Sequence, residues 1–137
     1  MAYLIGAGLA VLVGGLVAWT GMDRDRALYP AALMVIACLY DLFAVIGADL
    51  QVLGPELLGT ALFVGMAVLG FRTSLWWVVF GLVGHGVFDI FHPRLIANPG
   101  APVWWPAFCM TYDVAAGAWL AWRLTRPTGP RADFAPA

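Results

Sequence analysis

The sequence predicts an all-α fold, a polytopic membrane helix bundle with five transmembrane helices. Of its 137 residues, 63% are hydrophobic and only 11% are charged, whereas a soluble domain is nearer half apolar and a quarter charged. Long apolar runs recur along the chain, and each crossing of a bilayer needs about 20 residues. The formal net charge of −1 offers no basic patch for nucleic acid, so the lipid bilayer is the predicted partner.

Charges, prolines and glycines mark the ends of the apolar runs. The predicted spans are residues 3–20, 28–48, 55–71, 74–92 and 105–124, together one domain over 1–125. Residues 126–137 are polar and proline-rich, which predicts a disordered cytoplasmic tail. The first run has no positive residue before it, which is the reverse of a secretory signal, so we expect a retained helix.

The arginines predict the orientation of the bundle. If the N-terminus lies outside, six of the seven positive residues fall in cytoplasmic segments and only Arg94 lies outside. Such an excess of arginine on one side is typical of cytoplasmic loops. We therefore expect a multi-pass protein of the cell inner (plasma) membrane, with its N-terminus outside and its C-terminus in the cytoplasm.

Small residues repeat at four-residue spacing on three of the predicted helices: Ala10/Gly14, Ala61/Gly65 and Asp113/Gly117/Ala121. Faces of this kind let helices approach closely in lipid. They predict tight packing within the bundle first, and they also allow a homo-oligomer through Gly/Ala helix faces.

Ionisable residues interrupt three of the apolar runs. His85, Asp89 and His92 stand four and three residues apart in "GHGVFDIFHP" and therefore share one helix face. Counted from the predicted ends, Asp41, His85 and Asp113 each lie roughly 10–12 Å below the outer surface, at 1.5 Å per residue. Three helices would thus form a funnel that opens to the extracytoplasmic side. The residues expected at its rim are Asp49, Glu56 and Arg94.

Charge counting indicates what this funnel could hold. Three buried carboxylates would face two imidazoles with no buried arginine or lysine, so a proton or a cation must balance them. The candidate catalytic residues are Asp41, His85, Asp89, His92 and Asp113. The candidate metal ligands are His85, Asp89, His92 and Asp113, which suit a divalent metal such as Zn²⁺ or Fe²⁺. For Cys38, Cys109 and Tyr112, taken singly, interhelical hydrogen bonding is the favoured role, and a disulfide is not expected.

Residues 84–119 resemble an uncharacterised family of small bacterial integral membrane proteins, described only as a domain of unknown function. The resemblance rests on His85-x3-Asp89-x2-His92, a proline-containing connector, Cys109-x3-Asp113 and a following Ala and Trp. This chain has Pro93 where relatives often have a second histidine, and Tyr112 where they often have a second cysteine. The resemblance implies that the polar face acts as a unit, and it implies no activity.

Two classes of function follow from these residues. The first is a metal- or proton-dependent membrane enzyme that acts on a lipid-like substrate, with a metal-activated water as the nucleophile if it is a hydrolase. The alternative is a proton or metal-ion transport or relay protein, or an accessory subunit of a larger membrane complex. The confinement of the polar residues to the outer half of the helices favours the enzyme.

Overall fold

The computed structural model describes residues 1–126, and these residues form helices and no strand. The elements are α1 (Ala2–Thr20), the short 3₁₀ helix η1 (Met22–Arg24), α2 (Leu28–Ala37), α3 (Leu39–Ile46), α4 (Leu50–Arg72), α5 (Trp76–Leu95) and α6 (Trp105–Thr125). The all-helical fold is therefore confirmed. The predicted disordered tail lies, apart from Arg126, outside the described residues.

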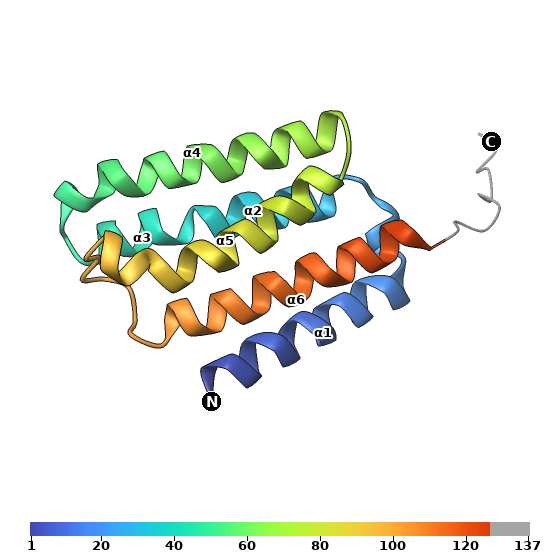
Figure 1. The fold of residues 1–137 in the computed structure, drawn as a ribbon, viewed down its shortest axis with the longest axis horizontal. Helices are drawn as coiled ribbons and strands as arrows, with labels where there is room; N and C mark the ends of the chain where they lie inside the picture. Colours follow the sequence, from blue (N-terminus) through green and yellow to red (C-terminus); the bar gives the residue numbers. More distant parts are fainter. Residues whose placement is uncertain (127–137) are drawn as a thin grey trace.

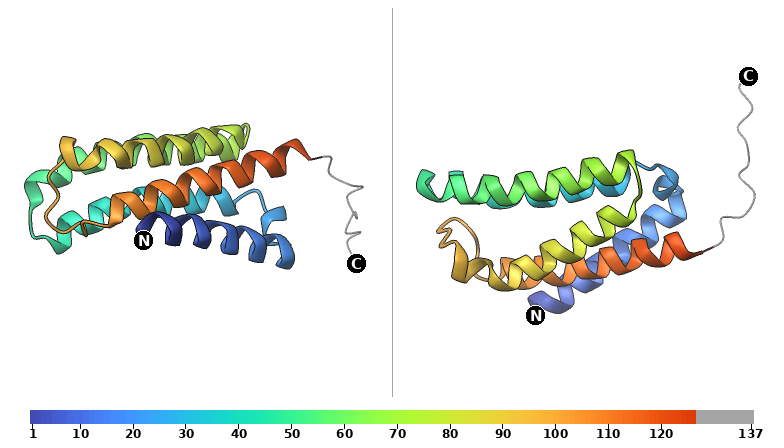
Figure 2. Two further views of the ribbon diagram at one scale, coloured as in Figure 1. Left: turned by 60° about the horizontal axis from the view of Figure 1, so that its bottom comes forward. Right: turned by 45° about the horizontal axis from the view of Figure 1, so that its top comes forward.

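Successive spans, with α2 and α3 together as one, run in opposite directions along the bundle, so α1 and α6 lie side by side in parallel (Figure 1). α6 packs between α1 and α5, and α4 packs on α2, α3 and α5. One end of the bundle gathers the turn at 47–49 and the connector between α5 and α6, residues 96–104; the other end gathers the turns at 21–27 and 73–75 (Figure 2). We call the first of these the connector end.

Three segments are long and apolar enough to cross a membrane, namely Ala2–Thr20, Leu28–Ile46 and Leu50–Arg72. α5 and α6 have 20 and 21 residues, but their polar residues lower their mean hydropathy. The surface supports a membrane location as well, because large apolar side chains such as Leu4, Leu58 and Phe80 are exposed while histidine and carboxylate side chains are buried. A soluble protein has the opposite distribution.

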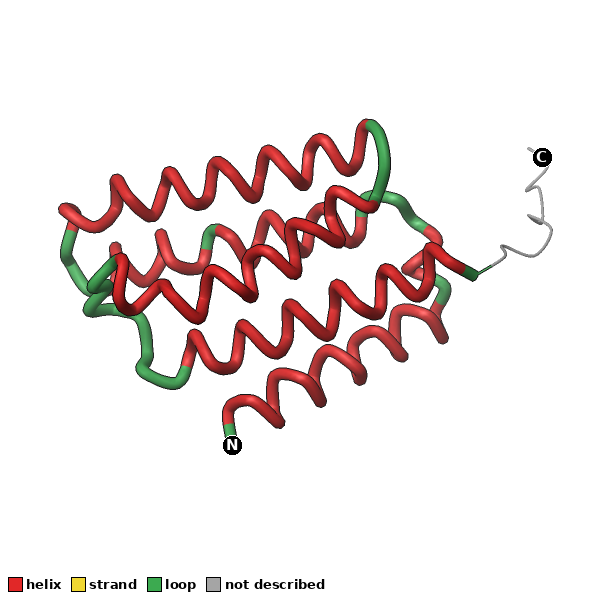
Figure 3. The backbone as a smooth tube through the Cα atoms, viewed as in Figure 1, coloured by secondary structure: helices red, strands yellow, loops and turns green. Residues whose placement is uncertain are grey.

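The second predicted helix is interrupted at Cys38, which separates α2 from α3 (Figure 3). At this point the Thr60 hydroxyl donates a hydrogen bond of 2.9 Å to the Ala37 carbonyl. A side chain that enters the backbone ladder in this way is a known cause of helix interruption.

α4 begins at Leu50, before the predicted boundary at Pro55, and it includes that proline. The Asp49 side chain accepts a hydrogen bond of 3.0 Å from the Gln51 backbone N–H and so caps the helix. Pro55 is the sixth residue of α4 and is exposed, so its missing N–H leaves the Gln51 carbonyl without an intrahelical partner at the surface of the helix. Since α4 begins at Leu50, Glu56 lies inside the helix rather than at its end.

Two of the three small-residue faces are used inside the chain. Trp119 of α6 packs against Gly14 of α1, and Gly117 of α6 lies against Leu82 and Val83 of α5. Gly65 of α4 is exposed and has no atom near the position of a side chain. The homo-oligomer stays a prediction, and among the described residues only the Ala61/Gly65 face is free for it.

Candidate functional site

α5 presents a polar face to the inside of the bundle. Its buried residues Leu82, His85, Asp89 and His92 recur at spacings of three and four, so they form one continuous stripe along the helix. The opposite side of α5 exposes apolar side chains such as Ile90. The stripe divides into two clusters, which contact different helices.

The inner cluster consists of His85, Asp89, Cys109 and Asp113. His85 Nδ1 lies 2.7 Å from Asp113 Oδ2 and 3.5 Å from Asp89 Oδ2. Cys109 Sγ, one turn before Asp113 on α6, lies 3.6 Å from the same Asp113 oxygen. One ligand atom from each of the four residues lies within 4.8 Å of the others. The pair His85 and Asp89 on α5 therefore meets the pair Cys109 and Asp113 on α6 at one point.

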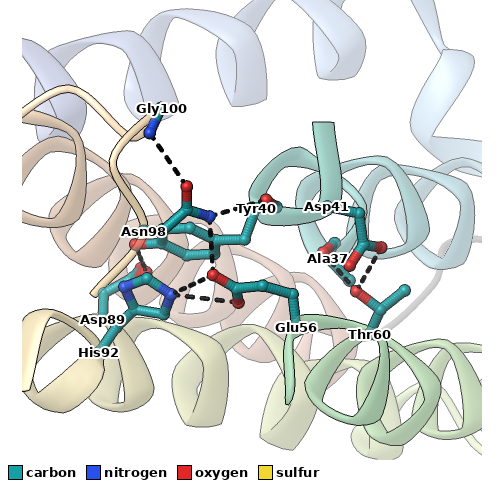
Figure 4. Close-up of polar contacts among 9 residues, drawn as sticks. All are labelled: Ala37, Tyr40, Asp41, Glu56, Thr60, Asp89, His92, Asn98 and Gly100. Atoms are coloured by element: carbon teal, nitrogen blue, oxygen red, sulfur yellow. Dashed lines mark hydrogen bonds and ion pairs between the residues drawn. The ribbon is translucent and has the colours of Figure 1, made fainter. Parts of the chain in front are cut away.

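The outer cluster, nearer the connector end, consists of Glu56, His92 and Asn98. His92 Nε2 lies 2.9 Å and 3.1 Å from the two carboxylate oxygens of Glu56. The Asn98 side-chain amide donates a hydrogen bond of 2.8 Å to Glu56 Oε1 (Figure 4). α4, α5 and the connector each supply one residue, so the cluster ties these three segments together.

Tyr40 of α3 joins the two clusters. Its hydroxyl donates a hydrogen bond of 2.7 Å to Asp89 Oδ1 in the inner cluster. Its ring stacks on the His92 ring with 3.7 Å between the centroids, and its backbone carbonyl accepts a hydrogen bond from Asn98. Tyr40 is 2% exposed. Through this residue α3 contacts both clusters of the site.

Asp41, the other candidate on α3, belongs to neither cluster. Its Oδ2 accepts a hydrogen bond of 2.8 Å from the Thr60 hydroxyl, which joins α3 to α4 (Figure 4). Asp41 is only partly buried. We expected Asp41, His85 and Asp113 to lie in one layer. The structure brings His85 and Asp113 together, and it places Asp41 beside Thr60 instead.

The buried charges need a balancing charge. The fully buried carboxylates and imidazoles of the described residues are Glu56, His85, Asp89, His92 and Asp113, each at most 2% exposed. Even two protonated imidazoles would leave one negative charge among the three carboxylates. Within the inner cluster, Asp89 Oδ2 and Asp113 Oδ1 are buried and have no hydrogen-bond partner. Buried oxygen atoms in this state call for a proton or a cation.

Two cavities adjoin this region. A cavity of about 10 Å³ is lined by Tyr40, Glu56, Thr60 and His85 together with apolar neighbours, and this is close to the space that one water molecule needs. A larger apolar cavity of about 70 Å³ lies between α1, α2 and α6. The polar lining and the size of the small cavity suit a water molecule or an ion that contacts both clusters.

Four residues of the site, Tyr40, Glu56, Asn98 and Cys109, were not among the predicted catalytic or metal-binding residues, and Cys109 was expected only to form a hydrogen bond. Glu56, expected at the rim, is 2% exposed and pairs with His92, so that expectation is wrong, because α4 starts one and a half turns earlier than predicted. The signal was present in the sequence, because Glu56, Phe63 and Ala67 have helical spacing on one face. Asn98 carried no comparable signal, because an irregular connector has no periodicity.

The fold and the site define this chain as a helical membrane protein with a buried His/Asp/Cys cluster. No family model, no curated protein and no solved structure matches the chain. The resemblance of residues 84–119 to an uncharacterised membrane protein family stays a prediction. The function is therefore inferred from the residues and their geometry alone.

Proposed function

We propose that this chain is a membrane-embedded, metal-dependent enzyme whose inner cluster holds a divalent transition metal ion. The observation that carries the proposal is the convergence of four ligand atoms within 4.8 Å, together with two buried carboxylate oxygens that have no hydrogen bond, Asp89 Oδ2 and Asp113 Oδ1. One imidazole, one thiol and two carboxylates are ligand types that suit Zn²⁺ or Fe²⁺. Cys109 thereby takes the place in the ligand set that the spacing suggested for His92.

The neighbouring residues support a metal site. Tyr40 donates to Asp89 Oδ1, which leaves Asp89 Oδ2 for a ligand and fixes the orientation of the carboxylate. Hydrogen bonds of this kind hold metal ligands in position and tune their basicity. A divalent cation would also offset the two negative charges of Asp89 and Asp113, and binding of Cys109 as a thiolate would release its proton and leave one negative charge on the inner cluster.

As an enzyme, the protein would act on a lipid-like substrate whose polar group reaches the inner cluster from the connector end. A metal ion at this position would supply a Lewis acid or an activated water molecule. The cavity beside His85 has room for one water molecule, in contact with Glu56 and Tyr40. These two residues would orient that water and exchange protons with it.

A transport or relay protein is the second candidate, because contacts continue from Asn98 through Glu56, His92 and Tyr40 to Asp89. The buried core beyond the inner cluster is apolar, with Leu33, Ala67 and Val78 facing inward. A conducting path normally has polar groups along its whole length. Metal-ion or proton flux into proteoliposomes that contain the purified chain would favour transport over the enzyme.

The proposed enzyme spans the plasma membrane five times, with its N-terminus outside and its C-terminus in the cytoplasm. This orientation is supported by the arginines, since it leaves only Arg94 on the outer side. A reporter that works only in the cytoplasm, fused after Ala137, should then be active, and an exported reporter at the same site should be inactive. The reverse pattern would mean that the connector end faces the cytoplasm.

The direct test of the metal site is elemental analysis of the protein purified in mild detergent without chelator. We expect about one Zn²⁺ or Fe²⁺ per chain, since one set of ligands converges. Protein that has been stripped with a chelator should regain the metal on dialysis against Zn²⁺. Protein that carries no metal as purified, and takes up none on dialysis, would rule out the metal-dependent enzyme.

A further inference from the structure

The connector covers the outer cluster and separates it from the surface at this end of the bundle. His92 is 2% exposed and Glu56 is 2% exposed, whereas Val103 and Trp104 of the connector are 99% and 54% exposed. The connector therefore lies at the surface with the outer cluster directly beneath it. Any hydrophilic species that reaches the inner cluster from this end must pass the connector.

Few polar contacts hold the connector in place. Its backbone hydrogen bonds are local, such as Asn98 N to the Ile96 carbonyl and Ala101 N to the Asn98 carbonyl. Among the hydrogen bonds of residues 1–126, only the Asn98 side chain ties the connector to α3 and α4, through the Tyr40 carbonyl at 3.0 Å and Glu56 Oε1 at 2.8 Å. Asn98 Oδ1 also accepts from the Gly100 backbone N–H, so one side chain fixes the fold of the loop and its attachment.

Close packing between the backbones of the connector and α3 adds to this contact. A side chain at Gly100 would overlap the Phe43 carbonyl, and one at Gly47 would lie 2.7 Å from the Gly100 nitrogen. The two glycines therefore let the connector lie directly on the end of α3. The side-chain contacts at this end are few, namely the Pro99 ring against Gly47 and the edge of Phe43 against Trp105, so the connector can move away and return without unfolding a helix.

We propose that the connector is a gate over the inner cluster and that Asn98 is its latch. Glu56 has two partners, His92 on α5 and Asn98 on the connector. When the amide of Asn98 leaves, Glu56 and His92 become the first polar groups that an entering cation or polar substrate group meets. The small cavity lined by Tyr40, Glu56 and His85 continues from there to the inner cluster.

The gate rests on the proposed function, since it admits the metal ion and the polar group of the substrate. The closed state leaves space for about one water molecule beside His85. A larger group can reach the inner cluster only when the connector opens. Asn98 and Glu56 thus select for species that can replace the amide–carboxylate hydrogen bond, which favours a cation or a hydrogen-bond donor.

The test uses Cys109 as a reporter of access, and it does not require a metal. The chain has two cysteines, and both are free, so Cys38→Ser leaves Cys109 as the only thiol. In detergent, a small water-soluble methanethiosulfonate should label the buried Cys109 slowly. Asn98→Ala should raise the labelling rate about 10- to 100-fold, the factor that loss of a hydrogen bond to a charged group gives.

Three matched variants make the result specific. Gln51→Ala removes an exposed amide at the same end of the bundle and should label at the parent rate. Cys109→Ser should not label. Asn98→Gln keeps the amide but moves it by one methylene, and it should give an intermediate rate if Asn98→Ala fails to fold. Equal rates in the parent, Gln51→Ala and the folded Asn98 variant would overturn the gate.

Preincubation with Zn²⁺ separates the gate from the metal site. If both proposals hold, Zn²⁺ slows the labelling of Cys109 in the parent and in Asn98→Ala. Faster labelling in Asn98→Ala without protection by Zn²⁺ supports the gate and counts against the metal site. Protection by Zn²⁺ with no effect of Asn98→Ala supports the metal site and overturns the gate.

Discussion

Asp113→Ala is expected to abolish stoichiometric metal binding. Asp113 lies at the centre of the inner cluster, because the same oxygen contacts His85 Nδ1 at 2.7 Å and Cys109 Sγ at 3.6 Å. It is also completely buried. Loss of a residue that only hydrogen-bonds to a metal ligand already lowers the metal affinity roughly 10–100-fold. We expect the loss of a ligand itself to lower the affinity further. Competition with a chromophoric chelator measures the affinity.

Asp41→Ala is the matched control for this prediction. Asp41 is also an aspartate on an apolar helix, but it accepts a hydrogen bond from Thr60 and lies outside both clusters. We expect this variant to keep its metal with an affinity near that of the wild type. His92→Ala extends the comparison, because it removes an imidazole that pairs with Glu56 rather than with the inner cluster. Equal loss of metal in all three variants would show that the inner cluster is not the binding site.

Glu56→Ala is expected to give the largest loss of stability among single changes in the outer cluster. The carboxylate bridges His92 and Asn98, and its removal leaves both side chains without their partner in a buried region. Breaking one side of a buried pair typically costs about 3–5 kcal/mol. Thermal or denaturant unfolding of the metal-free protein in detergent measures the change, so that metal binding does not contribute to it.

Two variants on the same helix serve as controls for Glu56→Ala. Glu56→Gln keeps an oxygen that can accept from Asn98, so we expect a smaller loss of stability. Asp49→Ala removes the cap of α4 and should cost about 1 kcal/mol. If Glu56→Ala were no more destabilising than Asp49→Ala, the outer cluster would not contribute to the stability of the bundle.

Much of the fold could be predicted because the membrane imposes it. In lipid, backbone polar groups must be satisfied within the segment, so long apolar runs form helices. The predicted starts at 3, 28 and 105 lie within one residue of α1, α2 and α6. The start of α4 was predicted less well, because Gly54–Pro55 is a typical helix breaker that the cap at Asp49 overrides.

The candidate site was predicted as one unit, and it divides into two clusters for a geometric reason. His85 and His92 share a face of α5, but seven residues at 1.5 Å per residue separate them by about 10 Å along the axis. One metal ion cannot bind both side chains at ligand distance. Asp89, one turn from His85, is close enough and has Tyr40 as a partner. Spacing predicts a shared face, and it does not predict which residues meet at one point.

Apolar length and helical periodicity are local properties, so they predicted the helices, the membrane class and the burial of His85, Asp89, His92 and Asp113. Three contacts became known from the packing of the helices: Cys109 joins the inner cluster, Glu56 pairs with His92, and Asn98 holds the connector. Each of these contacts joins segments whose relative rotation and height depend on packing. The interruption at Cys38 and the start of α4 at Leu50 likewise could not be predicted from periodicity.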